Sequence, residues 1–226
     1  MKKSIQNPKR IAGEQAARLV KNNMVVGLGT GSTTAYAIKE LGRHVADGLK
    51  ILGVPTSYQS AFLAAENGIP LTTLDEHPVI DIDIDGADQV ANFIVIKGGG
   101  AAHTREKIVA ESARKFVVIV DESKMAEVLN RHVPLEVIPC ARKLVEKNIG
   151  KLGGKTEVRM GVNKDGPVIS DNGNFIMDAD FGNIGDPLSL DKELSHCTGI
   201  VGHGIFTNAN VIYVGKKDGT VEILEP

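Results

Sequence analysis

A lysine, a glutamate and a run of glycines near the middle of the chain have the right types and spacing for proton transfer. Lys97 precedes three consecutive glycines, Gly98–Gly100, and Glu106 lies in the first turn of an expected helix. Consecutive glycines cost chain entropy, and they are useful where backbone N–H groups must wrap a negative ligand. Taken singly, Lys97 fits a surface lysine and Glu106 fits an acid at a helix start. Together they indicate a base beside an oxyanion site.

Two aspartates, Asp85 and Asp88, occupy the turn after an expected strand, where the sites of open α/β sheets gather. Asp81 and Asp83 precede them on the same strand face and fit a plain polar face. The string DIDIDG also resembles a calcium-binding loop. That loop needs a glutamate at its twelfth position, where this chain has Asn92, and it needs helices on both sides. We therefore expect Asp85 and Asp88 to act at the site, without a metal.

The segment GLGTGST, Gly27–Thr33, follows an expected strand and opens an expected helix. Backbone N–H groups there, with the hydroxyls of Thr30, Ser32 and Thr33, would form an anion site, although a tight capped turn fits the same residues. A dinucleotide fingerprint would have its third glycine where Thr34 stands, and the GK[ST] of a Walker loop is absent. A small phosphate fits better than NAD or ATP.

Lys124 follows the apolar run Phe116–Val120 and would add a second positive charge at the same sheet edge, although a solvated lysine fits equally well. The histidines show no paired metal-ligand spacing, so we expect no metal bound by His103, His132, His196 or His203.

The bulk composition is that of an ordinary globular protein. The 226 residues are 42% hydrophobic, with a net charge of −2, which argues against a nucleic-acid-binding surface. Cys140 and Cys197 form no CxxC pair, which favours a reducing compartment. The N-terminal segment lacks an apolar run, and no stretch approaches membrane-spanning length. These features predict a cytoplasmic protein that binds neither nucleic acid nor membrane.

The first half of the chain alternates apolar strands with helical patterns, which predicts a Rossmann-like, mostly parallel sheet with helices on both faces. The later residues read as a smaller α+β domain of the ferredoxin-like kind. The final segment contains Asp218-Gly219 between two apolar runs, so we expect a hairpin that rejoins the first sheet. The expected domains are residues 1–128 with 205–226, and residues 129–204.

The expected elements follow from apolar periodicity and turn residues. Expected strands cover residues 24–28, 51–54, 79–84, 93–96, 116–120, 157–160, 168–171 and 175–180. Expected helices cover residues 11–20, 34–41, 60–67, 106–114, 141–148 and 188–196. The segment 133–139 contains two prolines and is expected to be a connector.

The motifs GTGST, DGAD, KGGGAAxTREK, VIPxAR and KLGG occur in the order and spacing of type A ribose-5-phosphate isomerases, which the chain resembles over nearly its whole length. Gln89 and His103 depart from the common family pattern. The resemblance implies interconversion of D-ribose 5-phosphate and D-ribulose 5-phosphate through an enediolate, in the non-oxidative pentose phosphate pathway. It also implies no metal or organic cofactor and a homodimer or homotetramer.

The resemblance carries the family's site residues onto this chain, with Glu106 as the base. The implied catalytic residues are Glu106, Asp85, Asp88 and Lys97. The implied substrate-binding residues are Thr30, Gly31, Ser32, Thr33, Gly86, Ala87, Gly98, Gly99, Gly100 and Lys124.

Two other functions compete with an isomerase. A sugar-phosphate sensor would usually carry a DNA-binding module, and only about two dozen residues precede the first expected strand. A nicotinamide oxidoreductase is disfavoured by the missing glycine and the missing acidic residue. A purely structural protein would not need three glycine-bearing loops at strand ends.

Overall fold

The computed structural model describes residues 7–226, and its backbone contacts divide the chain into two compact units. Unit 1 comprises residues 1–87, 108–125 and 208–226, and unit 2 comprises residues 88–107 and 126–207. The domain bounds expected from the sequence placed residues 88–107 with the first domain, whereas the contacts group them with the second unit.

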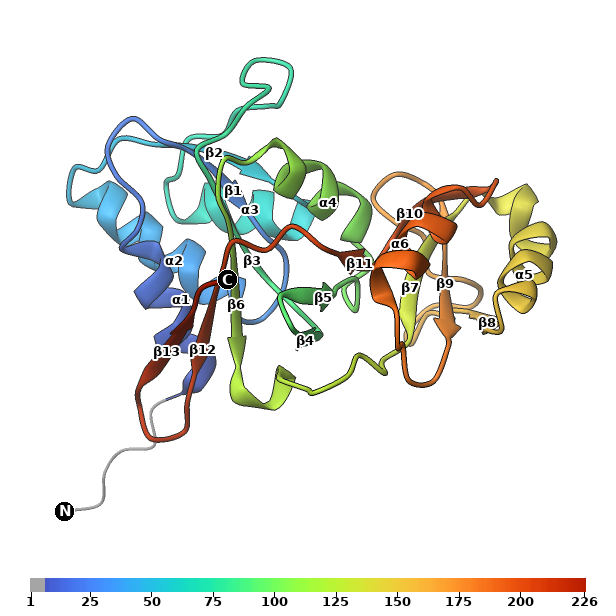
Figure 1. The fold of residues 1–226 in the computed structure, drawn as a ribbon. Helices are drawn as coiled ribbons and strands as arrows, with labels where there is room; N and C mark the ends of the chain where they lie inside the picture. The colour runs from blue at the N-terminus through green and yellow to red at the C-terminus, as the bar shows by residue number, and fades with distance from the viewer. Residues whose placement is uncertain (1–6) are drawn as a thin grey trace. The chain divides into compact units, whose positions relative to one another are not determined.

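Unit 1 is built on a six-stranded sheet in the order β13-β12-β6-β3-β1-β2, in which only β13 runs antiparallel (Figure 1). This confirms the expected mostly parallel sheet. The strands are β1 (Val25–Leu28), β2 (Leu52–Pro55), β3 (Ile82–Gly86), β6 (Phe116–Asp121), β12 (Val211–Gly215) and β13 (Val221–Leu224).

Helices cover both faces of the unit 1 sheet. Successive strand residues point to opposite faces, so neighbouring residues of one strand pack in different cores. Val26 packs in a core with residues of α1 (Pro8–Ala17), α2 (Thr34–Ala46) and α3 (Tyr58–Glu66). Its neighbour Val25 packs in a second core with Val109, which lies on α4 (His103–Ser112). The two cores confirm the expected helical cover on each side of the sheet.

The expected C-terminal hairpin is present and joins the first sheet. β12 and β13 pair antiparallel, and β12 pairs parallel with β6. Asp218 accepts hydrogen bonds from the backbone N–H and the hydroxyl of Thr220, and Gly219 adopts a φ of 92°. The Asp-Gly sequence therefore makes the turn that its composition predicted.

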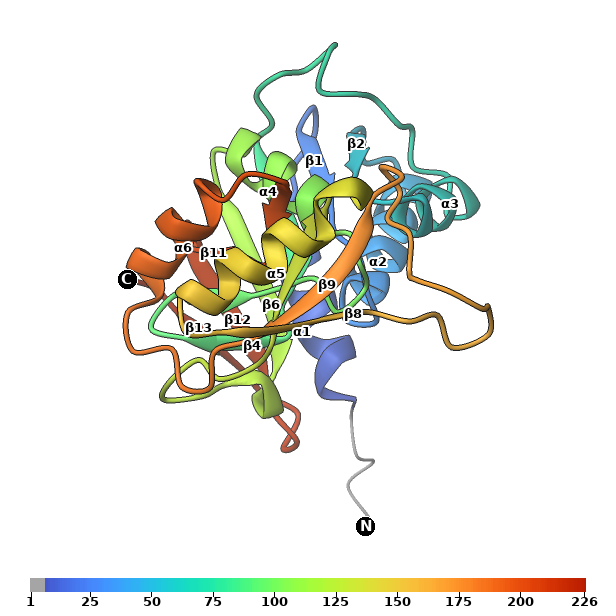
Figure 2. The same cartoon turned by 90° about the vertical axis from the view of Figure 1, so that its right-hand side faces the viewer.

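Unit 2 contains a four-stranded antiparallel sheet, β10-β7-β9-β8, and a three-stranded sheet, β11-β5-β4. Helix α5 lies across β8 and β9 (Figure 2), and its Val145 and Ile149 share a core with Met177 and Ala179 of β9. The elements are β4 (Gln89–Ala91), β5 (Ile94–Ile96), β7 (Val133–Val137), α5 (Arg142–Lys151), β8 (Lys155–Val158), β9 (Phe175–Asp180), α6 (Pro187–Ser195), β10 (Ile200–His203) and β11 (Ile205–Phe206). Two short 3-10 helices, Glu122–Lys124 and Pro139–Ala141, complete the described elements.

Two expectations for unit 2 were wrong. The expected connector at residues 133–139 contains β7, which pairs with both β9 and β10. Pro134 has no N–H to donate, and it is tolerated because the Gly204 carbonyl accepts from the Lys97 N–H, while the Pro134 carbonyl accepts from the Gly204 N–H. The strand expected at residues 168–171 is reduced to an isolated bridge between Ile169 and Phe175.

Candidate active site

Lys97 and Glu106 form a buried ion pair within unit 2. Lys97 follows β5, Glu106 lies in the first turn of α4, and Lys97 Nζ is 3.3 Å from Glu106 Oε2. Both residues are almost completely buried, where charged side chains occur mainly when they are paired. The Lys97 ammonium and the positive end of the α4 dipole both attract the Glu106 carboxylate and hold it at this position.

The aromatic ring of Phe206 supports the Lys97 ammonium. Strand β11 pairs with β5, and the Lys97 N–H donates to the Gly204 carbonyl at 2.8 Å. This register places the ring centroid 5.5 Å from Lys97 Nζ and 5.1 Å from Lys107 Nζ. Rings attract cations over their faces, so buried Phe206 helps to hold the lysine. The sequence analysis missed this residue, because an aromatic in a two-residue strand gives no local signal.

The three glycines after Lys97 form a tight turn beside Asp88. The Ala101 N–H donates to the Gly98 carbonyl at 3.0 Å, and Gly98 adopts a φ of 106° that favours glycine. The Gly99 N–H donates to Asp88 Oδ2 at 2.7 Å. The structure thus brings Asp88, Lys97, Gly98–Gly100 and Glu106 together in one unit.

Unit 1 contains the hydroxyl-rich loop and Asp85. Asp85 is fully buried, and its Oδ1 accepts from the N–H groups of Thr30 at 3.1 Å and Gly86 at 2.7 Å. A Cβ on Gly29 would lie 2.1 Å from the same oxygen, so only glycine fits there. The Thr30 hydroxyl lies 2.6 Å from the Ser57 hydroxyl. Asp85 therefore holds the loop between β1 and α2 in a fixed shape.

Two lysines add positive charge near this loop. Lys9 Nζ donates to the Ser32 hydroxyl at 3.1 Å. Burial alone would raise the pKa of Asp121, but hydrogen bonds from Ser123 and the charges of Lys9 and Lys124 lower that pKa overall. The sequence-predicted Lys124 thus lies near a second cation that motif spacing did not select. Residue 9 is far in sequence from the glycine motifs and was not selected as a site residue, and the position of α1 brings its side chain to the loop.

The predicted site residues fall into two groups. Unit 1 holds Thr30, Gly31, Ser32, Thr33, Asp85, Gly86, Ala87 and Lys124, and unit 2 holds Asp88, Lys97, Gly98, Gly99, Gly100 and Glu106. Within residues 7–226, no cluster of three or more His, Cys, Asp or Glu side chains could hold a metal ion. No helix in that described range is long and apolar enough to cross a bilayer.

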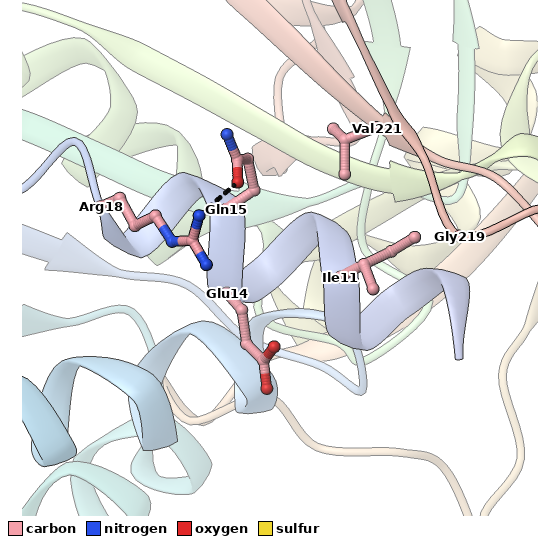
Figure 3. Close-up of a pocket in the computed structure, with 6 residues that line it drawn as sticks. All are labelled: Ile11, Glu14, Gln15, Arg18, Gly219 and Val221. Atoms are coloured by element: carbon pink, nitrogen blue, oxygen red, sulfur yellow. Dashed lines mark hydrogen bonds between the residues drawn. The ribbon is translucent and has the colours of Figure 1, made fainter. Parts of the chain in front are cut away.

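A surface hollow on unit 1 lies apart from these residues. Figure 3 shows its lining from α1 and the hairpin, with Ile11, Glu14 and Gln15 on the helix and Gly219 at the hairpin turn. The Arg18 guanidinium donates to Gln15 at 3.2 Å. None of the residues that line it belongs to the predicted site, so we assign it no catalytic role.

Two buried histidines of unit 2 remain neutral at ordinary pH. Burial lowers the pKa of His103 to about 4 and, together with the Lys107 charge, lowers the pKa of His203 to about 3. His103 Nε2 lies 3.3 Å from the Gly202 carbonyl, and His203 Nε2 lies 3.0 Å from the Ser195 hydroxyl. The named contacts of these two histidines are with a backbone carbonyl and a serine hydroxyl of unit 2, so we assign them no catalytic role.

These shifts predict acid-sensitive stability. Because each pKa is below its ordinary value of 6.5, the unfolded chain binds more protons as the pH falls below that value. The free energy of unfolding should therefore fall between about pH 6.5 and 4, by about 1 kcal/mol per pH unit for each histidine. Urea unfolding at several pH values measures this slope. His203→Gln should flatten it by one histidine's share, and equal slopes in both proteins would contradict the assignment.

The fold and the two groups of residues define an α/β protein equipped for proton transfer on an anionic substrate. Residues 52–219 match the family model of ribose 5-phosphate isomerase A (phosphoriboisomerase A). The chain is 59% identical to the ribose-5-phosphate isomerase A of Methanosarcina acetivorans over 218 residues, which cover 96% of this chain and 93% of the relative. The chain belongs to the ribose 5-phosphate isomerase A family.

Solved structures of relatives share the fold over the full length. The ribose 5-phosphate isomerase A of Methanocaldococcus jannaschii is 45% identical, with a TM-score of 0.94 over 99% of this chain and 100% of that chain. A D-ribose-5-phosphate isomerase in complex with phospho-erythronic acid is 47% identical, with a TM-score of 0.95 over 99% of this chain and 100% of that chain. These neighbours confirm the expected fold class.

Proposed function

We propose that Glu106 is the base of an aldose–ketose isomerase that interconverts D-ribose 5-phosphate and D-ribulose 5-phosphate through an enediolate. Membership of the ribose 5-phosphate isomerase A family supports the reaction. The observation that carries the residue assignment is the buried pair of Lys97 and Glu106 beside the glycine turn. A carboxylate that is buried next to a cation suits proton abstraction from a carbon beside a carbonyl.

The reaction moves one proton between two carbons of the open-chain sugar. Glu106 removes the proton from C2, the C1 carbonyl becomes an enediolate oxygen, and the same carboxyl returns the proton to C1. A second proton passes from the O2 hydroxyl to O1, which leaves the ketone at C2. Lys97 and the N–H groups of Gly98 and Gly100 stabilise the negative oxygen while it exists, and the Gly99 N–H holds Asp88.

The loop in unit 1 suits the phosphate of the substrate. Ser32 and Thr33 offer backbone N–H groups and hydroxyls at the start of α2, and Lys9 and Lys124 add positive charge. The N–H groups of Thr30 and Gly31 donate to Asp85 and Gln59 and fix the shape of the loop. The phosphate does not react, so its binding energy serves to hold the substrate while the sugar carbons react.

The two aspartates have different surroundings and, we propose, different duties. Asp85 accepts hydrogen bonds from Thr30 and Thr34, at the loop between β1 and α2, and from the N–H of Gly86. Its first effect is therefore to shape the phosphate site, and a role in ring opening is secondary. Asp88 is half-buried and is held by the Gly99 N–H. It is the better placed of the two to exchange protons with a sugar hydroxyl, since it lies in the same unit as Lys97.

An activity assay tests this proposal directly. The purified chain is mixed with ribose 5-phosphate in the presence of EDTA, and ketose formation is followed. We expect full turnover with EDTA, because the proposed steps use only side chains and backbone N–H groups. Absence of ketose would reject the isomerase, and NADH binding detected by fluorescence would favour the oxidoreductase instead.

We propose that the chain assembles with copies of itself in the cytoplasm. We expect a homodimer or homotetramer, which light scattering on the purified chain will distinguish from a monomer. Cys140 and Cys197 are both free thiols, as expected of a cytoplasmic enzyme.

A further inference from the structure

An arginine far along the sequence donates hydrogen bonds to the glycine turn of unit 2. Arg159 directly follows β8, and its Nη1 donates to the carbonyls of Gly98 at 3.0 Å and Gly99 at 3.2 Å. Its position, 61 residues from Gly98, explains why motif spacing did not select it. These are charge-assisted hydrogen bonds, which are stronger than bonds between neutral groups.

Asp178 fixes the arginine in this position. Arg159 Nε donates to Asp178 Oδ2 at 2.8 Å, and Nη2 donates to Oδ1 at 2.5 Å, which is a bidentate pair. Asp178 lies on β9, opposite Glu157 of β8, so the sheet sets its place. Both side chains are mostly buried, with exposed fractions of 20% for the arginine and 16% for the aspartate. The pair is therefore a rigid support rather than a mobile surface contact.

The hydrogen bonds from Arg159 set the direction of two peptide groups. No peptide bond in the described chain is cis, and in a trans peptide the C=O and N–H point in opposite directions. Because the Gly98 carbonyl faces Arg159, the Gly99 N–H faces the other way, and it donates to Asp88 at 2.7 Å. By the same geometry the Gly99 carbonyl faces Arg159, so the Gly100 N–H points toward the side of Asp88.

Glycine lets the Asp88 carboxylate lie close to the turn. A Cβ on Gly99 would lie 2.8 Å from Asp88 Oδ1, so the carboxylate would have to move away. The arginine, the Gly98–Gly99 peptide and Asp88 thus form a layered arrangement in which one peptide dipole lies between a cation and an anion. This arrangement favours the dipole's direction and holds the Asp88 carboxylate in place.

We propose that Arg159, held by Asp178, is a positioning residue that orients the N–H groups of Gly99 and Gly100 and thereby fixes Asp88 and the oxyanion cradle. This inference rests on the proposed isomerase function. It predicts that the arginine acts through the peptide groups. Its effect should be on the stability of the charged enediolate rather than on the binding of the substrate. A direct contact between Arg159 and the substrate phosphate is the opposing view, and it would change substrate affinity instead.

The principal test is Arg159→Lys, which keeps a positive charge but loses the planar fork. We expect kcat to fall about 10- to 100-fold, less than for loss of a direct oxyanion donor, with KM within about threefold of the wild-type value. The affinity for a phosphorylated aldonic acid, whose carboxylate imitates the enediolate oxygens, should fall by the same factor as kcat/KM. A raised KM with unchanged kcat would overturn the proposal in favour of phosphate binding.

Asp178→Asn provides the second test, because asparagine has nearly the same shape as aspartate. This variant keeps the proposal testable if Arg159→Lys does not fold. It should lower kcat in the same direction by a smaller factor, and the double variant should be no slower than Arg159→Lys alone, because the two residues act in series. Additive losses, or wild-type kcat in folded Asp178→Asn, would refute the support role.

A matched control separates this effect from a change in local charge. Arg131 lines the same surface hollow as Asp88, Gly99 and Arg159. It donates its backbone N–H to Gln89 Oε1 at 3.0 Å, and that bond does not depend on the side chain. Arg131→Lys should retain wild-type kcat, and an equal loss in both lysine variants would reject the specific role of Arg159. An inactive wild-type protein would reject the isomerase function itself, so the two failures are distinguishable.

Discussion

Replacing Glu106 with glutamine should reduce kcat by about 10²–10⁴-fold, because the amide cannot take the proton from C2. The variant should still bind the phosphorylated aldonic acid, since the phosphate loop is unchanged. Proton NMR in D₂O provides a sharper measurement than turnover. The wild type should exchange the C2 hydrogen of ribose 5-phosphate with solvent, and the variant should lose this exchange by the same factor as kcat.

The ion pair makes a stability control necessary. Removing one partner of a buried pair costs about 3–5 kcal/mol when the other charge is left uncompensated. The glutamine oxygen still accepts from Lys97, so Glu106→Gln should lose less than this. Combining it with Lys97→Met removes both charges and should restore thermal stability without restoring activity. Glu111→Gln, on the exposed face of the same helix, should keep wild-type kcat.

Undiminished turnover in a folded Glu106→Gln protein would refute the base assignment. Recovery of activity in the double variant together with its stability would also refute it, because that result would assign the loss to misfolding. The two variants therefore separate the role of Glu106 as the base from the contribution of the ion pair to stability.

Replacing Lys97 with alanine or methionine should lower kcat by about 10²–10³-fold and change KM much less, because the ammonium acts on the charge that develops during the reaction. Methionine retains most of the apolar stem and therefore isolates the charge. Steady-state kinetics with ribose 5-phosphate separates the two constants.

Lys107→Met is the matched control for the lysine. Lys107 contacts the same Phe206 ring, and it pairs with Asp191 at 3.6 Å within unit 2. We expect its removal to leave kcat near the wild-type value. An unchanged rate in Lys97→Met would eliminate the electrophilic role of Lys97, and equal losses in both variants would indicate a general effect of charge around the ring.

Local sequence determined the elements and most candidate residues. Apolar periodicity predicted the parallel strands and their helices, and Asp218-Gly219 predicted the closing hairpin that the structure contains. The glycine runs indicated close backbone approach, and Gly29 and Gly99 do face the carboxylates of Asp85 and Asp88. The elements and the glycine turns depend on residues near in sequence, which is why spacing was sufficient to predict them, whereas the partner of Gly29 lies far along the chain.

Only the tertiary structure decided which distant groups meet. Strand β7 was not predicted, because its proline is typical of a break. Only the tertiary structure shows that the Lys97 N–H donates to the Gly204 carbonyl beside Pro134, so the missing N–H is not needed there. Lys9 reaches Ser32 through helix packing, and Arg159 reaches the glycine turn through the pairing of β8 with β9. Sequence sets the period of each element, whereas sheet register and helix packing set the contacts between them, and those contacts give the site its geometry.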